Sequence, residues 1–106
     1  MITVKVTRNV NKKIVSFVLN GHAGYDVQGK DIVCAAVSSA AYMTANTITE
    51  ILQIPAHILV RNGHMRLRVS PDRADECQAI LAGLRLHLQA LQEQYPTGIQ
   101  LMNTEV

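Results

Sequence analysis

The chain has 106 residues, the length of one domain, and we expect a single domain over residues 1–106. Apolar residues make up 48% of it, which favours a folded globular chain over a disordered one. The formal charge of +2 is too small to predict nucleic-acid binding by itself. The sequence shows no secretory leader pattern and no uninterrupted apolar run of the ~20 residues that a membrane span needs. We therefore expect a cytoplasmic protein that contacts no membrane.

The N-terminal part of the sequence predicts a hairpin followed by a long loop. Apolar and polar residues alternate over 2–7 and again over 13–19, which is the period of half-buried strands. Residues 9–12 predict the turn between these strands. Residues 20–31 lose all periodicity and contain Gly21, Gly24 and Gly29, so they predict a loop. A loop of this length in a small domain is often functional.

A helix is predicted from residue 32 to about residue 52, where Ala, Val, Ile and Met are frequent and Pro and Gly are absent. Asp31 is its expected N-cap. Residues 32–37 are apolar on every side, and a helix with that pattern is expected to be buried all round.

A second hairpin is predicted over residues 56–69, because Asn62-Gly63 is the strongest short hairpin signal. Counting outward from this turn pairs Arg61 with His64. One face of the hairpin is then wholly apolar and is expected to meet the core. The opposite face is mainly basic and carries His57, Leu59, Arg61, His64, Arg66 and Arg68.

Ser70 and Pro71 predict the start of a second helix, as its N-cap and first residue. Its apolar stripe consists of Cys77, Ile80, Leu81, Leu84, Leu88 and Leu91. Residues 99–106 could form a final short strand. The order ββαββα, with that strand at the end, predicts an α+β fold, a two-layer domain with helices packed on a mainly antiparallel sheet.

The two cysteines have different predicted settings. Without a secretory signal, two cysteines do not predict a disulfide framework. Cys77 lies in the apolar stripe and is expected to be a small buried hydrophobe. Cys34 lies in the first turn of the first helix, where exposed N–H groups and the helix dipole favour a thiolate and could stabilise an oxyanion. Position alone leaves open that Cys34 is simply a core residue.

His22 is the best candidate for a base that would activate Cys34. It lies in the glycine-containing loop, and a loop that leads directly into a helix can fold back over the start of that helix. A solvated loop histidine is the alternative. The spacing of Cys and His residues matches no common metal-binding pattern, so we expect no metal and no cofactor.

Residues 21–38 read GHAGYDVQGKDIVCAAVS. This string resembles the signature of the ribosomal-processing cysteine protease (Prp) family, which is Gly-His-Ala, a glycine-containing loop, and then Gly-x-Asp-Ile-Val-Cys-Ala-Ala-Val-Ser. The likeness extends to the chain length and to the order of elements. It implies a cysteine endopeptidase that removes the N-terminal extension of a large-subunit ribosomal protein and so supports ribosome assembly.

The resemblance also implies roles for individual residues. Cys34 falls on the catalytic nucleophile, and His22 on the histidine that serves as general base and acid. Asp31 matches the aspartate before the helix, and it could orient His22, cap the helix, or do both. Ser38, on the Cys34 face of the helix, and Tyr25, in the loop, are weaker candidates for contacts with the substrate.

For partners, the resemblance implies the ribosomal-protein extension as a peptide substrate and a homodimer, with a mobile loop at residues 23–30 over the site. We expect no direct nucleic-acid binding. The main alternative is a non-catalytic ribosome-associated module that binds RNA or protein, because Arg61, Arg66 and Arg68 line one hairpin face. A solvated sheet face explains these arginines more simply. A different thiol enzyme with the same Cys-His pair is the other alternative.

Overall fold

The structure is a computed structural model that describes residues 1–24, 26 and 31–106. It confirms the predicted α+β fold and the predicted order of elements. The elements are β1 (Ile2–Arg8), β2 (Ile14–Asn20), α1 (Ile32–Asn46), a π-helical turn η1 (Thr47–Ile51), β3 (Ala56–Arg61), β4 (His64–Val69), a 3-10 helix η2 (Pro71–Cys77), α2 (Gln78–Gln94) and β5 (Ile99–Glu105).

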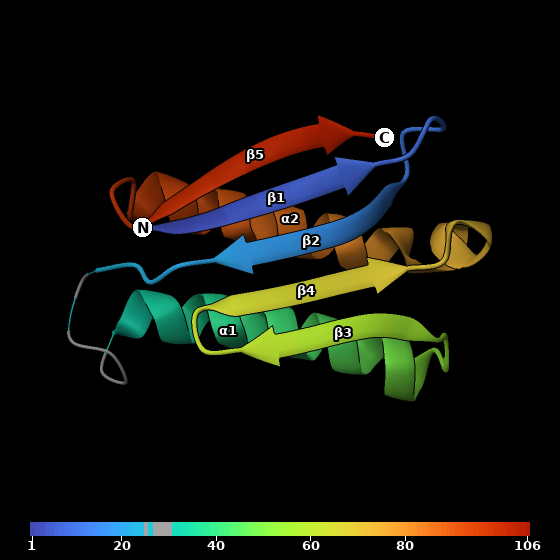
Figure 1. Ribbon diagram of the computed structural model, residues 1–106, viewed down its shortest axis with the longest axis horizontal. Coiled ribbons are helices and arrows are strands. Elements are labelled where there is room, and N and C mark those ends of the chain that lie inside the picture. Colours follow the sequence, from blue (N-terminus) through green and yellow to red (C-terminus); the bar gives the residue numbers. More distant parts are fainter. Residues whose placement is uncertain (25, 27–30) are drawn as a thin grey trace.

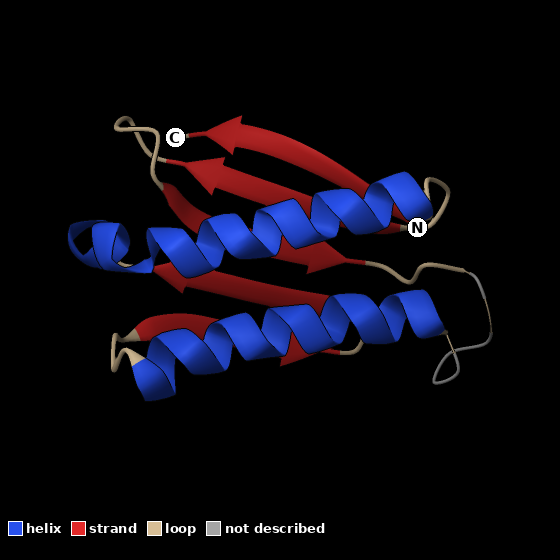
Figure 2. Cartoon of the chain, turned by 180° about the vertical axis from the view of Figure 1, so that it is seen from behind, coloured by secondary structure: helices blue, strands red, loops and turns tan. Residues whose placement is uncertain are grey.

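The strands form one five-stranded sheet in the order β3-β4-β2-β1-β5 (Figure 1). β5, the expected final strand, pairs in parallel with β1, and the other neighbouring strands are antiparallel. Both helices cover the same face of the sheet, so the molecule has two layers (Figure 2). The core lies between the layers, and its largest fully buried side chains include Phe17, Ile48, Ile54, Leu67, Leu81 and Leu88.

The second hairpin has the predicted register, with Arg61 opposite His64. The prediction that its whole apolar face meets the core is correct for β4, whose Met65, Leu67 and Val69 are buried. It is wrong for β3, where Ile58 and Val60 remain 37% and 45% exposed. The reason is topological: β3 is the edge strand of the sheet, so packing covers it less completely than a central strand.

Helix α1 begins at the predicted residue, but the prediction of a helix start buried all round is wrong. Val33, Val37 and Ala41 are buried against the sheet, whereas Ile32 is 68% exposed. A two-layer fold covers a helix on one face only, and the apolar outer side of α1 therefore meets solvent in the single chain.

The helical segment Ile32–Ile51 is the one span among the described residues that is long and apolar enough to cross a membrane, with a mean hydropathy of 1.2. Length and composition alone do not distinguish a membrane span from a core helix. Here the helix packs through Val33, Val37, Ala45 and Ile48 onto the sheet, which is the arrangement of a core helix.

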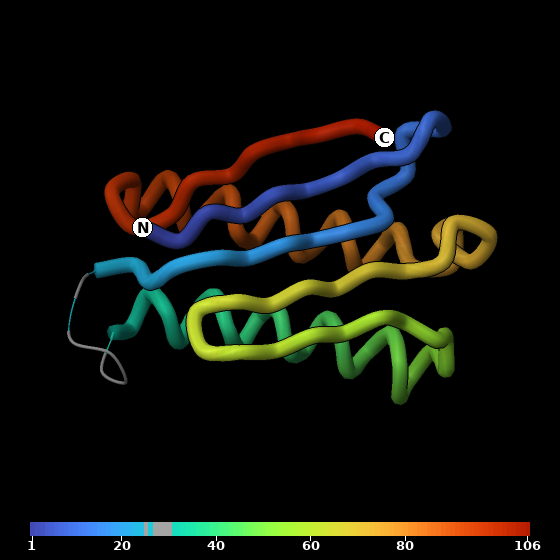
Figure 3. The backbone as a smooth tube through the Cα atoms, viewed as in Figure 1, coloured from blue at the N-terminus to red at the C-terminus, as the bar shows by residue number. Residues whose placement is uncertain are grey.

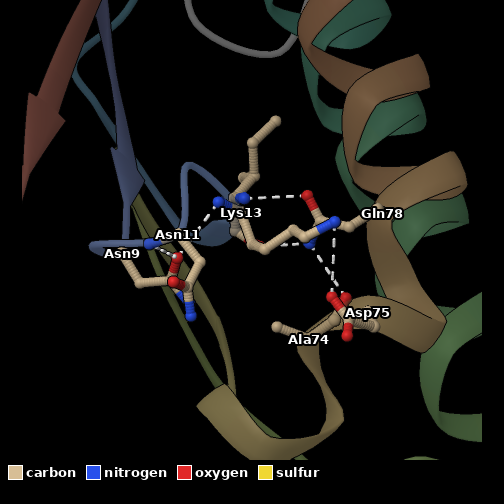
Figure 4. Close-up of polar contacts among 7 residues, drawn as sticks. Asn9, Asn11, Lys13, Ala74, Asp75 and Gln78 are labelled. Carbon is tan, nitrogen blue, oxygen red and sulfur yellow. Dashed lines mark hydrogen bonds and ion pairs between the residues drawn. The ribbon is translucent and has the colours of Figure 1, made fainter.

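The second helical segment starts at the predicted place with a different geometry. Pro71–Cys77 forms a 3-10 helix before α2, and the Ser70 side chain contacts Asp72 instead of capping the backbone. The Gln78 amide then ties the helical layer to the first hairpin (Figure 4). Its Oε1 accepts from Ile14 N at 2.8 Å, and its Nε2 donates to Ile14 O at 2.8 Å and to Ala74 O at 2.9 Å.

Candidate active site

A cavity of about 530 Å³ opens where three segments meet. These segments are the end of β2, the start of α1 and the turn between β3 and β4. Its lining includes four of the five predicted site residues, namely His22, Asp31, Cys34 and Ser38. The fifth, Tyr25, lies outside the described residues, as does most of the expected loop at 23–30.

Asp31 caps the helix that carries Cys34, as predicted. Its Oδ1 accepts from Val33 N at 2.9 Å and from Cys34 N at 3.1 Å, and its side chain is buried. Its Oδ2 accepts from Asp26 N at 3.3 Å. The carboxylate therefore holds the first turn of α1 and the loop before it in one arrangement. All of these hydrogen bonds come from backbone groups, which shows the cap role and leaves an orienting role for Asp31 as a prediction.

Cys34 is half-buried and faces the cavity. Its Sγ accepts a hydrogen bond from Ala23 N at 3.2 Å. The N–H groups of Val33 and Cys34, which the sequence suggested as oxyanion donors, are already bound to Asp31. The amide of Ala23 is instead the donor next to the sulfur, and it belongs to the loop rather than to the helix.

His22 is exposed and lies against the turn of the β3–β4 hairpin. A Cβ built on Gly63 would come within 3.0 Å of His22 Nε2, so the ring packs where Gly63 has no side chain. Gly21 N donates to Gly63 O at 2.8 Å and holds the two segments together. The end of β2 accordingly runs close to the turn between β3 and β4 (Figure 3). Among the hydrogen bonds of the described residues, none joins His22 directly to Cys34. The two side chains share the cavity without a preformed contact.

The wall of the cavity between α1 and the hairpin is largely apolar. Ser38 is exposed and lies one helical turn beyond Cys34 on the same side of the cavity, as expected. The apolar part of the wall consists of Val37, Ala41, Tyr42, Val60 and Met65. An apolar strip with a small polar residue beside it offers a surface on which an extended peptide can lie.

His64 is a lining residue that the sequence did not single out as part of the site. It is half-buried, its Nδ1 contacts Asn20 Oδ1, and it borders the cavity. The hairpin register placed it on the polar face correctly, but the sequence did not show that this end of β4 adjoins His22. That proximity results from the β2–β4 pairing, which sets Asn20 opposite His64.

Cys77 is fully buried and lines none of the cavity, as predicted. Burial, together with the nearby Glu76 carboxylate, raises the pKa of the Cys77 thiol. A buried neutral thiol is a poor nucleophile, which leaves Cys34 as the reactive candidate. In residues 1–24, 26 and 31–106, no cluster of His, Cys, Asp or Glu could hold a metal ion.

The family of cysteine protease Prp matches residues 1–100 of the chain. The ribosomal processing cysteine protease Prp of Staphylococcus aureus is 33% identical over 103 residues, which cover 95% of this chain and 97% of that protein. The protein of the same name from Bacillus subtilis is 22% identical over 107 residues.

Solved structures show the same fold. The crystal structure of the S. aureus protease Prp in complex with a covalently linked product peptide matches with a TM-score of 0.90 at 32% identity, over 97% of this chain and 99% of that one. The structure of the S. aureus protease with a substrate peptide matches with a TM-score of 0.85 at 31% identity, over the same shares of the two chains. The family match over nearly the whole chain and the agreement in fold lead to one conclusion: the chain belongs to the Prp family of cysteine proteases.

Proposed function

We propose that this cysteine protease removes the N-terminal extension of a large-subunit ribosomal protein in the cytoplasm, as a single catalytic domain over residues 1–106. The observation that supports this most is the shared cavity, which joins His22 and Cys34 from the two ends of the family motif. The names of the relatives support ribosomal processing as the setting.

Cys34 is the proposed nucleophile. His22 takes the thiol proton, Sγ attacks the scissile carbonyl carbon, and the C=O electron pair moves to oxygen as an oxyanion. The Ala23 N–H, already 3.2 Å from Sγ, is placed to donate to that oxyanion. His22 then protonates the leaving amine, and a thioester joins the acyl part of the peptide to Cys34. A water molecule, deprotonated by His22, hydrolyses this thioester and frees the thiol.

The absence of a direct His22–Cys34 hydrogen bond fits a site that tightens when a peptide enters. Catalytic hydrogen bonds are often long before substrate binds. Ser38 lies beside Cys34 in the lining and is the proposed polar contact for the peptide backbone. Tyr25 stays a candidate on the family resemblance alone.

A homodimer is the proposed assembly. Six exposed apolar side chains lie on α1, on the turn after it and on the edge strand β3, and exposed apolar patches often mark protein interfaces. They are Tyr42, Met43, Ile51, Leu52, Ile58 and Val60. Light scattering on the purified chain should give twice the chain mass of 11.7 kDa. A mass of one chain at micromolar concentration would contradict the dimer.

The decisive experiment is cleavage of a large-subunit ribosomal protein that carries its N-terminal extension, followed by mass spectrometry of the product. Cys34→Ala should abolish cleavage, and His22→Ala should slow it by about 10²–10⁴-fold. His57→Ala is the matched control, because His57 is an exposed histidine that does not line the cavity. Full activity in Cys34→Ala would overturn the proposed nucleophile.

A further inference from the structure

The face of the sheet opposite the helices, here called the outer face, is open along all five strands (Figure 1). Its residues are the outward-pointing ones that alternate with the buried core residues of each strand. The charged members are Lys5, Arg61, Arg66 and Arg68, and two histidines, His57 and His64, lie among them. The remaining positions are Thr3, Thr7, Ser16, Val18, Asn20, Leu59, Gln100, Met102 and Thr104.

The charge of the molecule is divided unevenly between this face and the rest. The outer face carries +4 and no Asp or Glu, counting histidines as neutral. The other six Lys and Arg residues and all eight Asp and Glu residues are not among the residues named above, so the rest of the chain carries −2. The net charge of +2 is therefore the sum of a strongly basic outer face and a rest of the chain that is acidic.

The cations of the outer face are also available for an outside partner. The ion pairs found among the described residues use Lys12, Lys13 and Arg73, and none uses a cation of the outer face. Arg66 and Arg68 are two residues apart on β4, about 7 Å along the strand. Lys5 lies in the same transverse row as Arg66, two strands away, because Val18 pairs with both. That separation is about 10 Å.

We propose that the outer face docks on the phosphate backbone of RNA. A spread of unpaired cations with no intervening carboxylate complements the regular negative charge of a nucleic-acid backbone. The outer face holds no Phe, Tyr or Trp, the large aromatic residues on which bases stack, and contacts between its cations and phosphates would carry no preference for sequence. It also lacks the cluster of large apolar side chains that would enter a lipid surface.

This inference differs from the expectation of no nucleic-acid contact, which rested on the small net charge and on a solvated sheet face as the simpler explanation of the hairpin arginines. The fold adds Lys5 from β1 and assigns every carboxylate to another part of the molecule. RNA is favoured over an acidic protein because the proposed substrate is a ribosomal protein, and to that extent the inference rests on the proposed function. Docking on RNA would hold the protease near ribosomal particles in assembly.

The test measures binding of the full chain to a fluorescent RNA duplex of about 20 base pairs by anisotropy, between about 50 and 200 mM salt. The variant Lys5→Gln/Arg66→Gln/Arg68→Gln removes three charges from the outer face and leaves the cavity lining intact. The control Lys12→Gln/Lys13→Gln/Arg73→Gln removes three charges from elsewhere. We expect the first variant to bind at least tenfold more weakly, with a salt slope reduced by about two to three units. The control should stay within about threefold of wild type, since only long-range attraction changes.

Three results would overturn the proposal: no binding of the wild-type chain at low salt, equal weakening in the two triple variants, or binding to phosphatidylserine vesicles without binding to RNA. If the triple variant does not fold, Arg66→Gln and Arg68→Gln singly should each lower the salt slope by about one unit. Cleavage of the peptide substrate is measured in parallel. If the wild-type chain cleaves the substrate but does not bind RNA, the docking face alone is refuted. If it binds RNA but does not cleave the substrate, the proposed function alone is refuted.

Discussion

Replacing Asp31 separates the two roles that the sequence left open for its carboxylate. The structure shows Oδ1 accepting from Val33 N and Cys34 N, and Oδ2 accepting from Asp26 N. Asn keeps an acceptor oxygen of the same shape, and Asn is as good an N-cap as Asp. Ala removes the acceptor altogether. If Asp31 acts through the backbone of the helix start, the two substitutions should differ strongly in stability and in activity.

The magnitudes follow from these contacts. Asp31→Ala removes the N-cap side chain at a position that is only 5% exposed. We therefore expect the free energy of unfolding to fall by about 2 kcal/mol, near the upper end of the range for loss of an N-cap. Asp31→Asn keeps the two bonds to the helix but presents an NH₂ group to Asp26 N. It also loses the attraction between a negative charge and the helix dipole. The two losses together should lower the free energy of unfolding by about 1 kcal/mol.

Urea unfolding measures the free energies, and cleavage of the ribosomal-protein substrate measures kcat and KM. We expect Asp31→Asn to keep kcat within about fivefold and Asp31→Ala to lose more, because the start of α1 sets the position of Cys34. A carboxylate that orients a catalytic histidine gives a far larger loss on conversion to the amide, on the order of 10⁴ in kcat. A drop above about a hundredfold in Asp31→Asn, with stability as expected, would refute the cap-only reasoning. Asp75→Asn, at an exposed carboxylate away from the cavity, is the control.

Three further predictions use the same assays. Gly63→Ala should lower kcat more than Gly24→Ala. Both substitutions place a side chain at a residue with positive φ, but only the Cβ at Gly63 meets His22, at 3.0 Å from Nε2. Equal losses of kcat in the two variants would show that backbone strain alone is responsible. Gln78→Leu should lower the free energy of unfolding by about 1–3 kcal/mol, because it strands two backbone groups of the first hairpin; an unchanged urea midpoint would contradict this. Burial raises the pKa of the Cys77 thiol, so above about pH 8.5 the unfolded chain loses a proton that the folded chain keeps, and stability should fall as pH rises. Cys77→Val should remove that part of the fall, and an identical pH dependence in the variant would count against it.

The features that the sequence predicted correctly are those determined by neighbouring residues. Asn62-Gly63 specifies a two-residue turn, and the turn specifies the register of β3 and β4. Asp31 precedes an apolar run and caps it. Alternation marks β1 and β2 because each strand has one face on the core. Each of these signals lies within about ten residues of the structure that it predicts.

The features that the sequence missed depend on which strands become neighbours. Ile58 and Val60 are exposed because β3 is at the edge, and alternation is the same in an edge strand and a central one. Gly63 meets His22 because β2 pairs with β4, a contact between residues about forty positions apart. Local pattern could name both residues, but only the order of strands brings them together.

The position of the cavity gives the proposed mechanism a structural constraint. Cys34 belongs to the helical layer. Asp31 caps the first turn of α1, and the buried Val33 packs that turn against the core. His22 follows β2 and packs against the turn at Gly63, so it belongs to the sheet layer. The hydrogen bond from Ala23 N to Cys34 Sγ joins the two layers at the reacting atom. Base and nucleophile can therefore meet only when the layers are packed, and the proposed pair should be inactive in any partly folded chain that has lost the packing of α1.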